Sequence, residues 1–157
     1  MKIPMTVIIS TFVIDIASKM AVEKFVVTPP YVIPISPHFN VVHSFNRGVS
    51  FGLFNSSDPH APYVLAAFAL VIVVGLLIAL WRSKLVICTL GYALIVGGAL
   101  GNVLDRLRDG AVTDFLDFYV DQYHFPTFNF ADAFIFCGVI TLLVSYTRPS
   151  TAKRVFR

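Results

Sequence analysis

The sequence predicts an all-α membrane protein with four transmembrane helices and a small β element at one membrane surface. Apolar residues make up 57% of the 157 positions and the mean hydropathy is +0.78, which exceeds what a soluble core of this size requires. Only 13% of the residues are charged, about half the share typical of globular proteins. No internal repeat or linker divides the chain, so residues 1–157 are expected to form one domain.

Three of the four predicted spans are long apolar stretches. Residues 61–81 contain no charge, and as a helix these 21 residues measure ~31 Å at ~1.5 Å per residue, close to the hydrocarbon thickness of a bilayer. A second span, residues 85–104, follows after the short polar link 82–84, so the two helices are expected to form an antiparallel hairpin. A third stretch, residues 130–147, carries Asp132 near its start.

The first apolar segment, residues 3–22, has two interpretations. Lys2 followed by apolar residues resembles the charged and hydrophobic regions of a signal peptide. Asp15 and Lys19, however, stand four positions apart, so on a helix they share a face and neutralise each other inside a bundle. Residues 3–22 are therefore predicted to form a further transmembrane helix.

The charged residues predict the orientation of the chain. With four spans, seven basic and no acidic residues lie on the side of the two termini, which identifies that side as cytoplasmic. These basic residues are Lys2, Arg82, Lys84, Arg148, Lys153, Arg154 and Arg157. The acidic residues of the opposite, outer side are Glu23, Asp58, Asp109, Asp117 and Asp121. Because the basic residues lie at segment ends rather than along one face, the pI near 9.0 does not predict nucleic-acid binding.

The first outer segment has the composition of short strands. Residues 26–42 are rich in β-branched side chains and are interrupted by four prolines, a pattern typical of extended structure at an edge or interface. In residues 42–54, Asn46 and Gly48 stand between apolar flanks, which predicts a turn between two strands. A small β layer is therefore expected at the outer surface.

Two carboxylates are the strongest candidates for chemistry. Asp132 opens the last span and Asp114 lies in an apolar context, and a charge at the membrane surface is costly unless it has a role. Two carboxylates held together at reduced dielectric share a proton, so the ionised member can act as a general base on water. The protonated member can polarise a scissile carbonyl and help to protonate the departing amine. This chemistry hydrolyses peptides without a metal, a cofactor or a covalent intermediate.

Each of these residues also has a purely structural interpretation. Asp114, Asp117 and Asp121 follow i, i+3, i+7 spacing, which suits the solvated face of a helix. Asp132 suits a helix N-terminus, where a negative charge interacts favourably with the macrodipole.

Other hydrolytic schemes have less support. The sequence has no His-Glu-x-x-His or Gly-x-Ser-x-Gly motif, and its four histidines lack zinc-ligand spacing, so no metal site is predicted. A dyad of Ser18 or Ser50 with Lys19 remains formally possible, although Asp15 is better placed to hold Lys19.

The main rival from another class is a small proton-coupled transporter or channel subunit with Asp114 and Asp132 as a proton relay. A relay distributes ionisable groups through the membrane depth, whereas the acids of this chain cluster near one surface. A structural assembly factor leaves the cost of the two acids unexplained.

Four short blocks, in order along the chain, resemble the signature of the lipoprotein signal peptidases. The blocks consist of Asp15 with Ser18 and Lys19; Asn46 to Phe51; Gly97 to Arg106 followed by Gly110, Val112, Asp114 and Phe115; and Phe125, Pro126, Phe128, Asn129, Ala131 and Asp132. Each block is short, but all four in this order, with four spans in matching places, are highly specific.

The resemblance implies four transmembrane helices, an outer β-cradle and a short periplasmic helix in the bacterial cytoplasmic (inner) membrane. It implies an aspartic endopeptidase that cleaves diacylglyceryl-modified prolipoproteins before the lipidated cysteine, near the outer face, and that binds globomycin-type inhibitors. Catalytic roles then fall on Asp114 and Asp132. The residues expected to line the substrate site are Asn46, Gly48, Asn102, Arg106 and Asn129. We expect a monomer, without metal or cofactor, surrounded by membrane lipid.

Two features of the third span are expected to support this site. Gly97, Gly98 and Gly101 make a flat helix surface, which would bring the last span close to the third. Asp105 and Arg106 are expected to form a charge pair that anchors the segment presenting Asp114.

Overall fold

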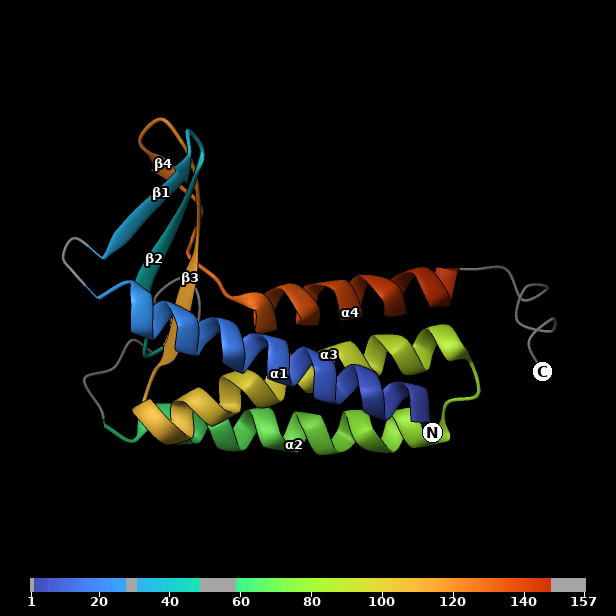
Figure 1. Ribbon diagram of the computed structural model, residues 1–157. Helices are drawn as coiled ribbons and strands as arrows, with labels where there is room; N and C mark the ends of the chain where they lie inside the picture. Colours follow the sequence, from blue (N-terminus) through green and yellow to red (C-terminus); the bar gives the residue numbers. More distant parts are fainter. Residues whose placement is uncertain (1, 28–30, 49–58, 148–157) are drawn as a thin grey trace.

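The protein, described here by a computed structural model over residues 2–27, 31–48 and 59–147, is built on four long helices. They are α1 (Lys2–Phe25), α2 (Ala61–Arg82), α3 (Val86–Asp109) and α4 (Phe130–Thr147), and each is long and apolar enough to cross a membrane. The helices run side by side in one bundle, and the strands gather at one end of it (Figure 1). The predicted multi-pass membrane protein with four spans is confirmed.

Two helices extend further toward the sheet than the sequence predicted. α1 continues past residue 22 to Phe25, and α3 continues past residue 104 to Asp109. Gly110, with a φ of 68°, adopts the left-handed conformation that ends α3, a conformation that glycine accepts at little cost. The longer α3 carries Arg106 and Arg108 in its last turn, where cations interact favourably with the helix dipole.

α3 is the central helix and packs against the other three. The expected glycine surface is present, but it serves two neighbours rather than the last span alone. A Cβ at Gly98 would lie 2.5 Å from the carbonyl oxygen of Ala131 on α4. A Cβ at Gly97 or Gly101 would instead overlap α1, at Thr11 and at Asp15 respectively. The glycines therefore bring α1 and α4 against the same turns of α3.

The strands form one antiparallel sheet in the order β1-β2-β3-β4. Its strands are β1 (Val32–Ser36), β2 (Phe39–Asn46), β3 (Val112–Val120) and β4 (Tyr123–His124). The short strands expected within residues 26–42 are present as β1 and the first part of β2, which continues to Asn46. The described residues contain no further helix beyond the four, and the rest of the predicted turn and strand up to residue 54 falls outside them.

β3 is the element that the sequence did not predict. The helical spacing of Asp114, Asp117 and Asp121 suggested a solvated helix face, and that interpretation is wrong. Asp114 and Asp117 lie on β3 and are buried, while Asp121 follows the strand in a turn with a φ of 53°. The strand pairs with β2 along most of its length, which supplies the backbone hydrogen bonds of both segments.

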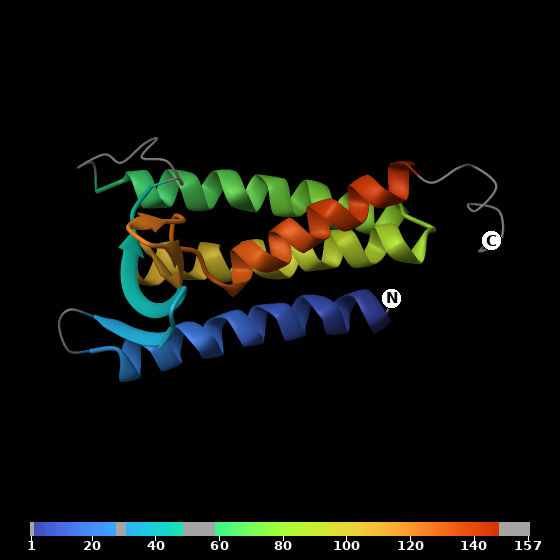
Figure 2. The ribbon, with the colours of Figure 1, turned by 90° about the horizontal axis from the view of Figure 1, so that it is seen from above.

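The sheet is attached to the bundle through a small apolar cluster. Phe115 of β3 packs with Val22 and Val26 at the end of α1, and its ring lies 5.4 Å from that of Phe130 at the start of α4. Seen from above, the sheet curves across the end of the bundle where α1 and α3 end and α4 begins (Figure 2). This attachment positions the acidic residues of β3 above the first turn of α4.

Candidate active site

Asp114 is held by two side-chain amides that come from different elements. Asn46, the last residue of β2, donates from Nδ2 to Asp114 Oδ2 at 3.0 Å, and Asn129 donates from Nδ2 to Oδ1 at 2.7 Å. The side chain of Asp114 is 2% exposed. Its carboxyl group is therefore desolvated on all sides but remains hydrogen-bonded at both oxygens.

Asp132 lies in the first turn of α4, and its carboxylate is held by Asn102 and by the backbone of Asn129. Asn102 of α3 donates from Nδ2 to Asp132 Oδ1 at 2.8 Å, and the backbone nitrogen of Asn129 donates to Oδ2 at 3.3 Å. In return, the side-chain oxygen of Asn129 accepts from the backbone nitrogen of Asp132 at 3.0 Å. This reciprocal arrangement caps α4, so the helix-terminal role expected for a charge at Asp132 coexists with its place in the site.

Asn129 joins the two carboxylates. It contacts Asp114 through its side-chain nitrogen and Asp132 through its backbone nitrogen, and it is completely buried. In the sequence, the rest of β3, a turn and β4 separate the two acids. They come together because the chain returns alongside β3 before α4 begins, where Phe128 pairs with Leu116.

Burial and charge shift the titration of Asp114. Desolvation is the larger cause and the charge of Asp132 the next, and together they raise the pKa of Asp114 to about 7 against the hydrogen bonds from Asn46 and Asn129, which lower it. A carboxyl group with this pKa is partly protonated at neutral pH, which is the state required of a general acid.

Lys19 organises the floor of the site. Its ammonium group lies 2.7 Å from Asp15 Oδ2, 2.8 Å from Asp105 Oδ2 and 2.9 Å from Asn102 Oδ1, and its side chain is 1% exposed. The pairing of Asp15 with Lys19 predicted from their spacing is thus present, with Asp105 as a second partner. Because Asn102 directs its oxygen to Lys19, its nitrogen is left to face Asp132.

The two acids bound to Lys19 also hold the backbone beside each candidate catalytic residue. Asp15 Oδ1 accepts from the backbone nitrogen of Ala131 at 2.8 Å, and Asp105 Oδ2 accepts from the backbone nitrogen of Thr113 at 3.2 Å. The lysine cluster therefore fixes the residues immediately before Asp132 and Asp114. Thr113, which the sequence did not single out, makes this link because it lies on the unpredicted strand.

Arg106 does not form the predicted charge pair with Asp105. Its guanidinium group reaches the backbone oxygens of Asn102 at 3.3 Å and Gly48 at 3.5 Å. Adjacent residues of an α-helix point about 100° apart, so Asp105 points toward Lys19 in the bundle and Arg106 toward the end of β2. Gly48 in turn donates its backbone N–H to Asn46 Oδ1 at 3.1 Å. Asn46 therefore stabilises the turn with its side-chain oxygen while its side-chain nitrogen donates to Asp114.

The alternative nucleophile is placed elsewhere. Ser18 donates its hydroxyl to the backbone oxygen of Asp15 at 2.7 Å, and Lys19 is occupied by its acidic partners. Ser50, the other candidate, lies outside the described residues. Within residues 2–27, 31–48 and 59–147, no three His, Cys, Asp or Glu side chains come together as a metal site.

The chain is similar to known proteins over most of its length. The family model described as signal peptidase (SPase) II matches residues 7–148. The lipoprotein signal peptidase of Aeromonas hydrophila subsp. hydrophila is 42% identical over 147 residues, which cover 92% of this chain and 87% of that protein. The lipoprotein signal peptidase of Yersinia pseudotuberculosis serotype O:1b is 40% identical, over 91% of this chain and 86% of that protein.

Solved structures show the same fold. A bacterial membrane enzyme solved at 2.3 Å resolution superimposes with a TM-score of 0.83 at 22% identity, and the match covers 98% of this chain and 93% of that one. A second bacterial membrane enzyme structure, at 1.9 Å resolution, gives a TM-score of 0.81, also at 22% identity, with 94% of each chain covered. The family match over most of the chain, the curated relatives and the shared fold together lead to one conclusion: the chain belongs to the signal peptidase II family.

Proposed function

We propose that this protein is an aspartic endopeptidase that removes the signal peptide from diacylglyceryl-modified prolipoproteins, with Asp114 and Asp132 as its catalytic pair. The observation that carries the proposal is the convergence of the two carboxylates on Asn129, at the end of a membrane-spanning bundle. The family and the names of its relatives support a lipoprotein substrate.

The two aspartates differ in a way that suits two roles. Asp114 is almost fully buried and its pKa is raised to about 7, so it acts as the protonated partner. Asp132 is more exposed and accepts hydrogen bonds from Asn102 and Asn129, one at each carboxylate oxygen. Asp132 is therefore assigned as the general base and Asp114 as the general acid.

In this assignment Asp132 removes a proton from a water molecule as the water oxygen attacks the scissile carbonyl carbon. Asp114 donates its proton to the carbonyl oxygen, so charge does not accumulate there in the tetrahedral intermediate. When the C–N bond breaks, a proton held by the pair passes to the leaving nitrogen, and the diol proton returns to Asp114. Two side-chain amides hold the acids in place throughout. Asn102, which is oriented by Lys19, binds Asp132, and Asn46, at the end of β2, binds Asp114.

The remaining site residues have supporting roles in the same proposal. Asn46, Gly48 and Arg106 border the side of the site formed by the end of β2, and are assigned to the substrate and to globomycin-type inhibitors. The site is supported from the interior of the bundle by the ion pairs of Lys19 with Asp15 and Asp105. We further propose that the protein lies in the bacterial cytoplasmic membrane as a monomer, with both termini cytoplasmic and the sheet on the outer side.

A proton-coupled transporter receives less support from the structure. α2 carries no acidic residue, and the acids Asp15, Asp105, Asp114 and Asp132 contact Lys19 or Asn129 in the part of the bundle nearer the sheet. A relay requires ionisable groups spread across the membrane.

The deciding experiment uses purified full-length protein in lipid vesicles with a diacylglyceryl-modified prolipoprotein. We expect the product mass to show cleavage before the lipidated cysteine, little cleavage of the same protein without the lipid, and inhibition by globomycin. Asp114→Asn and Asp132→Asn are expected to be inactive, whereas Asp121→Asn, an acid-to-amide change in the β3–β4 turn, is expected to cleave normally. Proton flux without proteolysis would support the transporter instead.

A further inference from the structure

Thr113, the residue before Asp114, is held by hydrogen bonds from three other parts of the chain. It lies on β3 and is completely buried. Its backbone nitrogen donates to Asp105 Oδ2 of α3 at 3.2 Å, and its backbone oxygen accepts from Asn129 Nδ2 at 3.4 Å. Its hydroxyl donates to Glu23 Oε1 of α1 at 3.2 Å. The first two contacts belong to the candidate active site, whereas the third connects Thr113 to a residue outside it.

The side chains of Thr113 and Asp114 lie on opposite faces of β3, because successive residues of a strand point to opposite faces. Thr113 contacts Glu23 on the reverse face of the strand. Asp114 accepts from Asn46 on the face of the candidate active site. Asp105 holds the backbone between these two faces. A strand that is held at its backbone and on its reverse face resists rotation about its own axis, so the direction of the Asp114 side chain depends on the contacts of Thr113.

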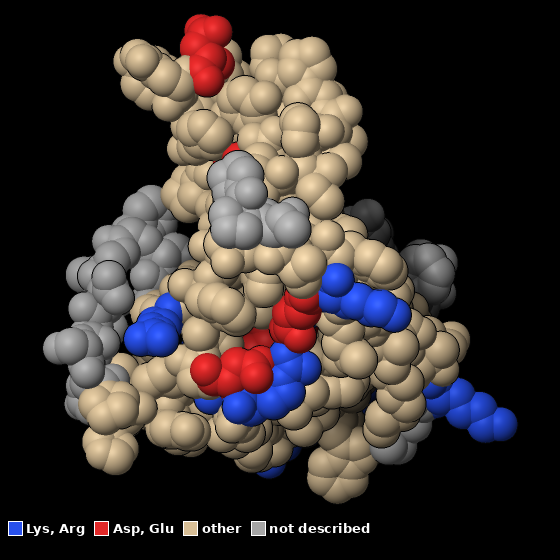
Figure 3. Space-filling model, turned by 60° about the vertical axis from the view of Figure 1, so that its left-hand side comes forward, with Lys and Arg blue, Asp and Glu red and all other residues tan. Residues whose placement is uncertain are grey.

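Glu23 is itself fixed by an ion pair. Arg108 Nη2 lies 2.6 Å from Glu23 Oε1, the oxygen that accepts from Thr113, and 2.6 Å from Asp109 Oδ2. Acidic and basic side chains lie beside one another on this face of the molecule, below the sheet (Figure 3). A carboxylate that is bound to a guanidinium group by a charge-assisted hydrogen bond loses much of its freedom to move. Glu23 therefore offers the Thr113 hydroxyl an acceptor at a fixed place.

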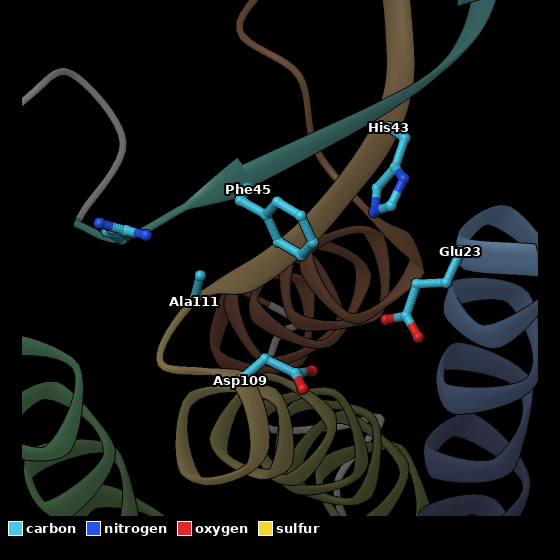
Figure 4. A pocket seen from close by; sticks show the side chains of 6 residues that line it. Glu23, His43, Phe45, Asp109 and Ala111 are labelled. Carbon is cyan, nitrogen blue, oxygen red and sulfur yellow. The ribbon is translucent and has the colours of Figure 1, made fainter. Parts of the chain in front are cut away.

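A pocket of about 410 Å³ lies beside the start of β3, on the same face as the Thr113 hydroxyl. Phe45, the register partner of Thr113 on β2, lines it together with Glu23, Asp109 and Ala111. The carboxylates of Glu23 and Asp109 point into this space from α1 and α3, below Phe45 (Figure 4). Apolar packing against the start of β3 is therefore incomplete on this face. The hydrogen bond to Glu23 provides support here that close packing provides in a filled interior.

We propose that Thr113 is a positioning residue for Asp114, and that Glu23, fixed by Arg108, acts on cleavage through the Thr113 hydroxyl. The inference rests on the proposed function, because it takes Asp114 as a participant in the reaction. Neither Thr113 nor Glu23 touches the substrate in this proposal, so both affect the rate of bond cleavage and not the binding of the substrate. A small displacement of a catalytic group is enough to slow a reaction.

The test measures the rate of cleavage in single turnovers, which reports the chemical step, and KM in the steady state, with full-length protein in vesicles and a lipidated prolipoprotein. Thr113→Val keeps the branched shape but loses one hydrogen bond, so cleavage should be about fivefold slower with KM unchanged. Thr113→Ser keeps the hydroxyl and should restore most of the rate. Thr141→Val is the matched control: the Thr141 hydroxyl bonds only within α4, to the backbone oxygen of Cys137 at 2.7 Å, and the rate should be unchanged.

A double-mutant cycle tests whether Glu23 acts through Thr113. Glu23→Ala should slow cleavage about as much as Thr113→Val, and the double variant should be no slower than either single variant, because both remove the same contact. Asp109→Ala removes the other partner of Arg108 but no contact with Thr113, so its rate should stay near that of the wild type. The Tm of each variant, measured in the same vesicles, shows that the protein is folded at the assay temperature.

A Thr113→Val rate equal to that of the wild type, or additive losses in the double variant, would overturn the positioning role. So would a change confined to KM, or a loss in Thr113→Ser as large as that in Thr113→Val. If Thr113→Val does not fold, the comparison of Glu23→Ala with Asp109→Ala decides, because neither changes β3, and equal rates in these two variants would overturn the proposal. A wild type that cleaves no lipidated substrate would contradict the proposed function itself.

Discussion

The side-chain nitrogen of Asn129 lies 2.7 Å from a carboxylate oxygen of Asp114, and both residues are buried. The backbone of the same asparagine donates to Asp132 at 3.3 Å, so one residue fixes the relative position of the two acids. The geometry of the pair therefore depends on a residue that has no acid–base chemistry of its own.

Replacing this asparagine should lower the rate of cleavage. In Asn129→Ala, Asp114 loses its shortest hydrogen bond and α4 loses its cap, so we expect kcat to fall about 100-fold, the size typical for loss of one preorganised donor. Cleavage kinetics on a lipidated prolipoprotein measure this change. Asn40→Ala is the matched control: Asn40 donates to Asp117 at 2.9 Å, away from the pair, and activity should be kept. Equal losses in both variants would show that only the fold had been disturbed.

The pH dependence of cleavage should report the protonation of Asp114. Its pKa of about 7 is raised by burial and by Asp132, and the proposed mechanism requires its protonated form, so kcat/KM should fall as the pH rises through about 7. The hydrogen bond from Asn46 lowers this pKa. Asn46→Ala should therefore move the alkaline limb of the profile to higher pH, and a shift to lower pH would contradict the assignment of Asp114 as the acid.

The buried lysine should dominate the stability of the bundle. Lys19→Met leaves Asp15 and Asp105 buried without their cation, and removing one partner of a buried ion pair costs about 3–5 kcal/mol. We expect a markedly lower Tm in detergent and partial recovery when Asp15→Asn is added, because fewer buried charges then remain unpaired. Lys24→Met, at the end of the same helix, provides the surface control. An unchanged Tm in Lys19→Met would show that the cluster is not structural.

Close helix contact should be sensitive to a single methyl group. Gly98→Ala places a Cβ about 2.5 Å from the backbone of Ala131, which must shift α4 away from α3. Overpacking of this kind costs about 1–3 kcal/mol, and it also displaces Asp132, so both Tm and activity should fall. Gly75→Ala on α2 meets no atom within 4 Å and should be neutral or slightly stabilising. The reverse order of the two variants would contradict the packing described here.

The spans and the pairing of Asp15 with Lys19 were predictable because each rests on local sequence, whereas the amides around the two acids were expected only from the family resemblance. Hydropathy over about 20 residues identifies a membrane helix without knowledge of its neighbours, and the spacing of Asp15 and Lys19 indicates their ion pair directly. The helices α1 and α3 continue beyond the predicted spans, because charged residues in the part of a helix beyond the apolar run resemble loop residues.

The strand β3 and its contacts could not be predicted in the same way. The acids of residues 114–121 fit helical spacing as well as a strand, and only pairing with β2, far away in the sequence, decides between them. The contact of Arg108 with Glu23 and that of Arg106 with Gly48 likewise depend on how helix ends meet the sheet. Such long-range contacts leave no periodic signal in the chain.

The proposal that Asp114 and Asp132 share a proton can be tested directly by infrared spectroscopy across a pH titration of the protein in lipid. We expect the carbonyl stretch of one protonated carboxyl group to disappear near pH 7, to be absent in Asp114→Asn, and to titrate at lower pH in Asp132→Asn, where the neighbouring negative charge is gone. If no carboxyl group titrates near neutral pH, or if its titration is the same with and without Asp132, the two residues do not act as a coupled pair.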